Sequence, residues 1–598
     1  MNDNNLILSI FAFAIGIALY FSLPFEPVVQ FPLSIAALAA ACFYRLRWNI
    51  LLFLFGFFWT VFIAGTIDTE LVTRNRSSYK LSGTIERIDY ANTRQRIFVR
   101  ENNGRLIRVS MTRDIPCRTG EDVNLRVRLW APNTINAFSN FDYARHAFWN
   151  GLSGTASVIS GSCAGVKDNA LRDRIHFAAN NRLVDSLVLG YKSAQPREEF
   201  ERVKNLGIAH VFSISGMHLT LVGGWIYFIL YFFIRLFPAW TRRYPAKYFA
   251  LPITAVFLFG YLILSGGSTA TIRSYAMLVF GIIAILMNRK VLTLRNALLV
   301  FAAMIFANPF WLVSVGFQLS FAAIFGLLYY FRKPRFEGKS KLFKFFAIIF
   351  MMDVVATIWT APFVVYHFNY FPTYTLFGNV TMLPVFSFII MPFVMVGAAT
   401  SVIAGWREPL AVSDFVYSFV VRFANLVAEL PYALIEVKFL TGFSLFLIFG
   451  GFALWIVGRH KSAIFITVAA VIYSAVQPVP VLRTTKDSEV VGFTQNGVTK
   501  FNVNSSTENR FIIPHGNRNR ADCRRGKCVY RTENWTAVSF QRFVPLYRNM
   551  AKLCDYDFVI SRFPLTLYNC PEKVLRGSVQ IFEDGRVKLI APNRKWNQ

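Results

Sequence analysis

About thirteen apolar segments, each near the roughly 20 residues that cross a bilayer as a helix, are spread along this sequence of 598 residues. Hydrophobic residues make up 55% of the chain and charged residues only 16%. This balance, together with the long uncharged runs, predicts a polytopic α-helical membrane protein rather than a soluble core. We place the segments at 6–23, 28–44, 48–65, 211–234, 248–265, 270–287, 296–308, 310–331, 345–366, 373–398, 410–430, 439–458 and 462–479.

Basic residues between these segments predict how the chain crosses the membrane. Arg45 and Arg47 lie between the second and third segments, and cytoplasmic loops collect such residues. This places the N-terminus in the cytoplasm and the chain outside after residue 65. The major basic loops that follow all fall on the cytoplasmic side, and the C-terminus falls outside. The first segment lacks a basic start and a clear small-residue cleavage site, so we do not interpret it as a cleaved signal peptide.

Two long stretches outside the apolar segments are predicted to be soluble domains. In the first, apolar and polar residues alternate at 123–129, which is typical of a half-buried strand. Five strand candidates, with a short helix at 141–149 before the fifth, predict an inserted OB-like β-barrel. The second is predicted to be a small α/β or β-rich domain. The predicted division is therefore 1–67, 68–170, 171–480 and 481–598.

Five arginines flank one predicted hairpin of the barrel, and with Tyr90 and Phe98 they could bind a nucleic-acid backbone. The alternative interpretation is a solvated sheet face. The net charge of +30 agrees with a polyanionic partner or anionic lipid. The arginines are Arg94, Arg96, Arg100, Arg105 and Arg108.

Four of the seven cysteines lie in the C-terminal region. Cys523 and Cys528 could close a small hairpin loop, and Cys554 with Cys570 could form a second bridge, if this region faces an oxidising compartment. A zinc ion bound by the four thiolates is the alternative, although the spacings lack the paired CxxC of zinc ribbons.

The stretch 207–224, GIAHVFSISGMHLTLVGG, brings polar residues to the edge of an apolar segment. Polar groups at membrane depth tend to face a bundle interior or a water-filled path. A break near Gly216 would let both halves of the stretch point into one cavity. The alternative is that these groups are satisfied by hydrogen bonds between packed helices. The polar residues are His210, Ser213, Ser215 and His218.

Other polar residues lie inside later apolar segments. Arg273 is costly to bury unless it is paired or hydrated, and it suits an anionic substrate. Gln318 lies in the middle of its segment, either on a pathway or in a contact between helices. Asp353, Thr357, His367, Asn369 and Asn379 occur around two further spans, where a hydrogen bond between helices is the simpler interpretation.

Five motifs in series resemble the ComEC family of DNA internalisation proteins. They are FDYARHAFWNG, GIAHVFSISGMHL, GGSTATIRSYAM, GFQLSFAAIFGLL and WTAPFVVYHFNYFPTYTLFGNVTMLP. The resemblance implies a bacterial inner-membrane channel that passes single-stranded DNA into the cytoplasm during natural transformation, with a barrel outside that receives the DNA. It also implies a disulfide between Cys117 and Cys163. Because no GxxxxGK[ST] phosphate loop is present, a cytoplasmic helicase or ATPase is an expected partner, besides a periplasmic DNA receptor. Self-association into a homo-oligomer is compatible with this assignment.

The C-terminal region departs from the family pattern. Many family members end in a metallo-β-lactamase-like domain, whose metal site needs a cluster of the HxHxDH kind. Here His515 is the one histidine after residue 481, so we expect a degenerate domain without metal or cofactor and assign no catalytic residue. Two other functions stay open. One is a membrane-embedded hydrolase that uses His210 and His218, and the other is a small-anion transporter, for which we see no clear internal repeat.

Overall fold

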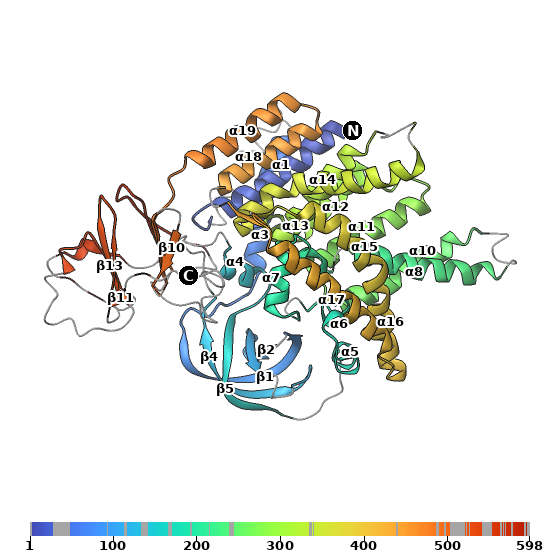
Figure 1. Ribbon diagram of the computed structural model, residues 1–598, viewed down its shortest axis with the longest axis horizontal. Helices are drawn as coiled ribbons and strands as arrows, with labels where there is room; N and C mark the ends of the chain where they lie inside the picture. Colours follow the sequence, from blue (N-terminus) through green and yellow to red (C-terminus); the bar gives the residue numbers. More distant parts are fainter. Residues whose placement is uncertain are drawn as a thin grey trace.

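The computed structural model places a large helical body above a β-barrel, with two further sheets at one side (Figure 1). It describes residues 3–594 with gaps at 28–47, 92–93, 113–116, 133–140, 165–169, 192–193, 215, 238–243, 334–337, 339, 438–439, 486–489, 496–497, 503–520, 522, 525–526, 541–552, 562–564, 566, 568–569, 576–577 and 591–593.

Two N-terminal helices, α1 (Asp3–Ser22) and α3 (Trp48–Thr66), pack tightly side by side. Their backbones come so close that a Cβ at Gly16 would collide with the Phe53 carbonyl, and one at Gly56 with the Phe13 carbonyl. Glycine at these positions therefore sets the helix spacing. The segment predicted at 28–44 lies outside the described residues.

The first soluble stretch is a closed five-stranded barrel in the order β1-β2-β3-β5-β4. In β4, Val123, Leu125, Val127 and Leu129 are buried while the residues between them are exposed, as the alternation predicts. Helix α4 precedes the fifth strand, so the predicted barrel with its helix is confirmed. The elements are β1 (Arg76–Tyr90), β2 (Arg94–Glu101), β3 (Leu106–Thr112), β4 (Asp122–Trp130), α4 (Tyr143–Trp149) and β5 (Gly154–Ala164).

Three short helices and a 3-10 turn lead from the barrel into the helical body. They are α5 (Leu171–Ala179), α6 (Arg182–Leu187), α7 (Arg197–Asn205) and η1 (Ala209–Phe212). The helices of the body follow: α8 (Gly216–Arg235), α10 (Lys247–Leu264), α11 (Thr269–Leu286), α12 (Leu294–Ala307), η2 (Pro309–Val313), α13 (Val315–Tyr330), α14 (Lys341–Phe368), α15 (Thr375–Val385), the π-helix η3 (Phe386–Ile390), α16 (Met391–Ala404), α17 (Glu408–Ala428), α18 (Gly442–Ile456) and α19 (His460–Val476). A two-stranded sheet joins β6 (Tyr370–Pro372) to β7 (Leu434–Glu436).

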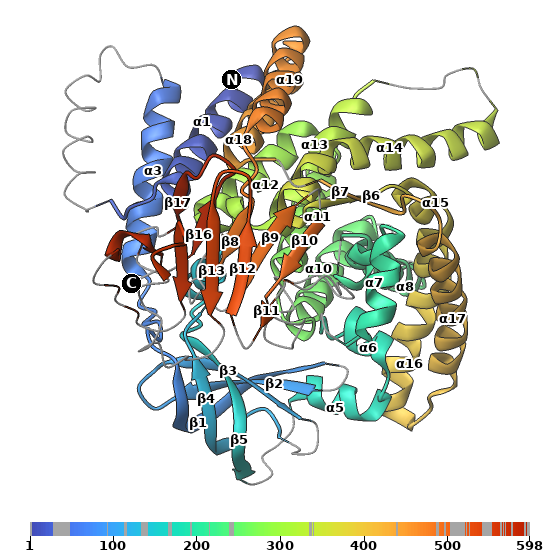
Figure 2. The ribbon, with the colours of Figure 1, turned by 60° about the vertical axis from the view of Figure 1, so that its left-hand side comes forward.

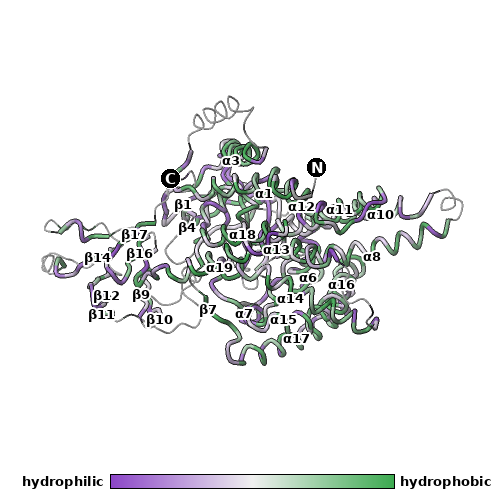
Figure 3. The backbone as a smooth tube through the Cα atoms, turned by 90° about the horizontal axis from the view of Figure 1, so that it is seen from above, coloured by the Kyte–Doolittle hydropathy of each residue, from purple (hydrophilic) through white to green (hydrophobic). Residues whose placement is uncertain are grey.

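Within the described part of the chain, eight spans are long and apolar enough to cross a membrane, and α12, α13, α18 and α19 are shorter apolar helices. Every segment predicted from the sequence coincides with one of these helices, apart from 28–44. The hydropathy of the tube in Figure 3 shows the same division, because α8, α10 and α11 are largely green. Large apolar side chains such as Phe228, Phe232 and Val256 are exposed on α8 and α10. Such surface is stable in contact with lipid chains.

The C-terminal region contains two five-stranded sheets, in the orders β10-β9-β8-β16-β17 and β11-β12-β13-β14-β15 (Figure 2). Leu482 and Val579 of the first sheet share a core with Tyr530 and Ile560 of the second, so the sheets pack together. The strands are β8 (Leu482–Thr484), β9 (Val491–Gln495), β10 (Val498–Phe501), β11 (Cys523–Arg524), β12 (Lys527–Arg531), β13 (Thr536–Phe540), β14 (Phe558–Ser561), β15 (Val574–Leu575), β16 (Val579–Ile581) and β17 (Val587–Leu589), with a 3-10 turn η6 (Pro571–Lys573).

All three expected cysteine pairs lie at disulfide distance. The Cα–Cα separations are 5.6 Å for Cys117–Cys163, 4.1 Å for Cys523–Cys528 and 5.9 Å for Cys554–Cys570. Cys523 and Cys528 face each other across the β11–β12 hairpin. The four C-terminal cysteines therefore lie as two pairs, in the pairing that the disulfide interpretation predicts.

Candidate functional site

The stretch 207–224 forms a 3-10 turn followed by a helix, so it is not one continuous helix. Gly207 adopts a φ of +84°, and a Cβ there would collide with the Thr375 side chain of α15. This position therefore requires glycine. The turn η1 carries His210 and ends before Ser213, and α8 begins at Gly216. Ser215 lies outside the described residues.

His210 and His218 lie near one another, on η1 and on the first turn of α8. They are close enough for a charge on one imidazole to disfavour a charge on the other. His218 is buried. His210 is exposed, and its Nδ1 lies 3.3 Å from the Gly207 carbonyl.

Arg273 of α11 lies close to the start of α8. A Cβ built on Gly216 would lie 3.5 Å from the Ser274 hydroxyl, so the helices touch at this level. The Arg273 side chain is only 4% exposed, and its Nη1 donates to the Gly316 carbonyl over 2.9 Å. No acidic residue of the described chain acts on it. Arg273 is therefore a buried cation held by a neutral carbonyl.

Gln318 of α13 hydrogen-bonds to two further elements, η2 and α14. Its Nε2 donates to the Leu312 carbonyl over 2.9 Å, and its Oε1 accepts from His367 Nε2 over 2.6 Å. Arg273 contacts the same turn of α13 that carries Gln318, because its partner Gly316 lies two residues before Gln318. The start of α13 thus brings together side chains from α11, α13 and α14.

Helix α4 carries a further cation from the barrel to this region. Asp142 caps the helix by accepting from the Arg145 backbone N–H over 3.1 Å. The Arg145 guanidinium acts electrostatically on His367, and its Nε is buried without a hydrogen-bond partner. Trp149 of the same helix stacks on Phe310 of η2, with the ring centres 5.8 Å apart. Arg145 and His367 were not assigned to a site from the sequence, although both lie within quoted motifs.

The five barrel arginines divide into paired and less constrained groups. Arg100 is ion-paired with Glu86, and Arg105 with Glu70. Arg96 and Arg108 lie near each other beside Tyr143 of α4, and the Arg108 guanidinium is 5.2 Å from that ring. Arg94 is exposed at the start of β2. The five arginines therefore form a positive face, and Glu86 and Glu70 neutralise part of its charge.

The two aromatic residues expected on that face do not offer free rings. Phe98 is 9% exposed and packs against Ala147 and Leu152, because α4 covers this side of the barrel. Tyr90 is 4% exposed and stacks on His176 with the ring centres 3.7 Å apart. The prediction that both rings lie on the open face was wrong, since neighbouring helices cover them.

Comparison with known proteins places this arrangement in a family. Residues 187–462 match the family described as Competence protein. A stretch of 292 residues is 25% identical to ComE operon protein 3 of Bacillus subtilis, and 278 residues are 24% identical to Recombination protein 2 of Haemophilus influenzae. Over residues 187–462 the chain is similar to this family, which confirms its resemblance to the ComEC family of competence proteins. The alignments cover 46% and 44% of this chain but only 36% and 35% of the two relatives. No solved structure matches it.

The similarity to the competence family and the apolar helices together support a location in the membrane. The matched region contains His210, Ser213, Ser215, Gly216, His218, Arg273 and Gln318. The barrel arginines, α4 and the C-terminal sheets lie outside it. In the described part of the chain, no three His, Cys, Asp or Glu side chains lie close enough to hold a metal ion.

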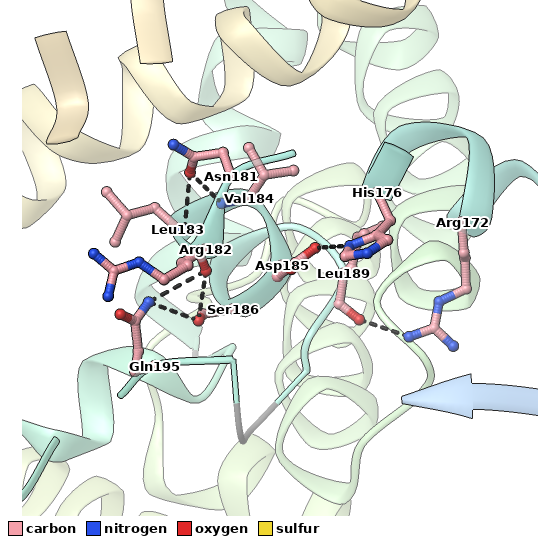
Figure 4. Close-up of polar contacts among 10 residues, drawn as sticks. All are labelled: Arg172, His176, Asn181, Arg182, Leu183, Val184, Asp185, Ser186, Leu189 and Gln195. Atoms are coloured by element: carbon pink, nitrogen blue, oxygen red, sulfur yellow. Dashed lines mark hydrogen bonds and ion pairs between the residues drawn. The ribbon is translucent and has the colours of Figure 1, made fainter. Parts of the chain in front are cut away.

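A polar linker attaches the barrel to the competence region (Figure 4). His176 Nδ1 donates to Asp185 Oδ1 over 2.6 Å, and Arg172 donates to the Leu189 carbonyl over 2.7 Å. The Asn181 side chain caps α6 through the backbone N–H groups of Leu183 and Val184. These bonds join α5 to α6 and to the residues that follow α6, so they hold the parts of the linker together.

Proposed function

We propose that this chain is a bacterial inner-membrane channel that passes single-stranded DNA into the cytoplasm during natural transformation. The match to the family described as Competence protein supports a role in DNA uptake, and the single-strand channel is our interpretation of the polar groups. In this proposal the barrel receives the DNA, residues 171–480 conduct it and the C-terminal sheets bind or support it. A periplasmic receptor and a cytoplasmic helicase or ATPase complete the pathway.

The orientation of the proposed channel is supported by its cysteines. All three disulfides lie in the barrel and the C-terminal sheets, and disulfides persist in oxidising compartments such as the periplasm. The basic loops between the apolar helices fall on the opposite side when the spans are counted from a cytoplasmic N-terminus. Both arguments give the same topology, with the N-terminus inside and the C-terminus outside.

The observation that carries the proposal is two cations with buried guanidinium atoms, Arg145 on α4 between the barrel and the bundle and Arg273 on α11 within the bundle. Arg145 has a buried Nε without a hydrogen-bond partner, and Arg273 is buried without an acidic partner among the described residues. A buried cation that lacks an acid is stabilised when an anion arrives, and guanidinium groups suit phosphate geometry. With Arg96 and Arg108 on the barrel, these side chains form successive phosphate contacts along the strand, while His210, Ser213 and His218 line the later path.

DNA uptake by cells with and without this gene tests the function directly. In cells that carry the gene, Arg273→Ala should lower the uptake of labelled DNA by about tenfold or more, because a charged hydrogen bond contributes roughly 1.5–3 kcal/mol. Arg422→Ala is the matched control, since Arg422 is an exposed arginine on α17. Unchanged uptake in Arg273→Ala, at equal protein level, would remove this residue from the path.

The two alternatives predict other results in the same cells. A membrane-embedded hydrolase would leave labelled DNA uptake unchanged when the gene is deleted but would show a pH-dependent activity in the purified protein. A small-anion transporter would move labelled phosphate across vesicles that contain only this protein. The channel proposal requires DNA uptake to disappear with the gene.

A further inference from the structure

Asp353 of α14 and Asn379 of α15 form a polar pair within the apolar body. Asn379 Nδ2 donates to Asp353 Oδ1 over 2.7 Å. The second oxygen of each side chain, Asp353 Oδ2 and Asn379 Oδ1, is buried without a hydrogen-bond partner. Asn379 as a whole is 8% exposed. Two buried acceptors are therefore left without a donor, which is costly in an apolar site.

Among the described residues, no charged group acts on the Asp353 carboxyl, although Arg145 of α4 acts on His367 at the end of the same helix. Asp353 lies near the middle of α14, about 18 Å along the axis from Lys341 at 1.5 Å per residue. The elements packed against α14, namely α13, α15, α18 and β6, contain no Asp, Glu, Lys, Arg or His, and their titratable groups are tyrosines at the end of α13 and in β6. On α14 itself the nearest charged or basic side chains are Lys344 and His367. An ionised carboxylate at this depth would be strongly disfavoured.

We infer that the Asp353–Asn379 pair is a proton-binding site, in which Asp353 Oδ2 carries the proton. The bound proton converts one of the two unpaired acceptors into a donor, and Asn379 Oδ1 supplies the acceptor. A carboxylic acid and a primary amide are then complementary, since each offers one donor and one acceptor. A metal ion fits less well, because hard cations take about six or more oxygen ligands, and Thr357 is the one other polar group beside the carboxyl.

The position of α15 connects this site to the stretch that begins at Gly207. A Cβ on Gly378, the neighbour of Asn379, would collide with the Leu206 carbonyl, and Thr375 packs against Gly207 in the same way. Beyond Val385 the helix continues as the π-helix η3, and such segments often occur at functional sites. Proton release would remove one of the two hydrogen bonds between α14 and α15, the one that Asp353 Oδ2 donates to Asn379 Oδ1, and would leave a buried negative charge beside that oxygen. The repulsion would shift α15 against η1. This coupling rests on the proposed function, whereas the proton site itself does not.

Infrared spectroscopy of the purified full-length protein in lipid tests the site without DNA. At neutral pH the wild type should show a carboxylic-acid C=O band that is missing from Asp353→Asn and that disappears on titration to alkaline pH. Asp122→Asn is the control, because Asp122 is an exposed carboxylate of the barrel and its loss should change carboxylate bands only. If the difference spectrum between the wild type and Asp353→Asn shows carboxylate bands alone, the inference is overturned. A band that changes when sodium replaces potassium in the buffer would also overturn it, because it would indicate a bound metal ion.

A second variant guards against a folding failure. If Asp353→Asn does not accumulate, the acid C=O band of Asn379→Leu should lie at a different frequency from that of the wild type, because this variant removes the amide partner. An unshifted band would overturn the pairing.

In cells, Asp353→Asn should lower DNA uptake about tenfold, the size expected of a coupling between two sites, and should abolish the dependence of uptake on external pH. Normal, pH-dependent uptake in this variant would overturn the coupling. If the wild-type chain supports no uptake, the proposed function fails, and the infrared result alone decides the proton site.

Discussion

The Cys117–Cys163 disulfide offers the sharpest test of how the barrel is stabilised. It closes a loop of 46 residues and joins the segment before β4 to the end of β5, with Cys117 1% exposed in the barrel core. If the bond acts by restricting the unfolded chain, a loop of this length contributes roughly 4 kcal/mol at 25 °C. The five-residue loop of Cys523–Cys528 contributes only roughly 2 kcal/mol on the same argument.

The perturbation is the double substitution Cys117→Ala and Cys163→Ala, which removes both thiols and leaves no new polar group. A loss of roughly 4 kcal/mol corresponds to about a thousandfold faster opening of the barrel, because each 1.4 kcal/mol is tenfold. Hydrogen exchange followed by mass spectrometry on β4 and β5 peptides of the full-length protein in lipid measures this directly. The pair Cys523→Ala and Cys528→Ala is the matched control and should leave the barrel peptides unchanged. Acceleration of less than about tenfold in the barrel variant would refute the loop-entropy reasoning.

Two other predictions concern the site and the barrel face. Gly207→Ala should reduce the amount of folded protein in fluorescence-detected gel filtration, because an L-residue at this positive φ costs about 1–2 kcal/mol before any collision with α15. Gly224→Ala, which has open space around it, should behave as wild type, and equal behaviour of the two variants would contradict the argument. Arg108→Ala should lower the salt dependence of single-stranded DNA binding by the purified protein by about one phosphate contact, a slope of roughly 0.7. Arg100→Ala should have a smaller effect, because Glu86 already neutralises that side chain, and equal slopes for the two variants would contradict this distinction.

Local patterns predicted the elements of this protein well. Runs of apolar residues and the two-residue alternation at 123–129 report burial directly, so the apolar helices and strand β4 coincide with the predicted ranges. Turn geometry also predicted the Cys523–Cys528 pair, since the two residues lie on one hairpin.

Contacts between distant segments could not be predicted in the same way. The sequence shows that Gln318 is polar within an apolar helix, but not that His367, 49 residues later, donates to it. It also marks Tyr90 as an aromatic residue at a strand end, but not that α5 covers the ring through His176. Which polar groups meet depends on how the helices pack, and no local period records that packing.

The barrel of this protein is fastened to the helical body at two separate places. At one place Trp149 of α4 stacks on Phe310 of η2. At the other, Tyr90 stacks on His176 of the linker. The linker is bonded to the helical body, because the Tyr261 hydroxyl of α10 donates to the Leu187 carbonyl. Two separate attachments leave the barrel less freedom to move than one would. Under the proposed function, the barrel would then serve as a stationary entrance that the DNA threads past.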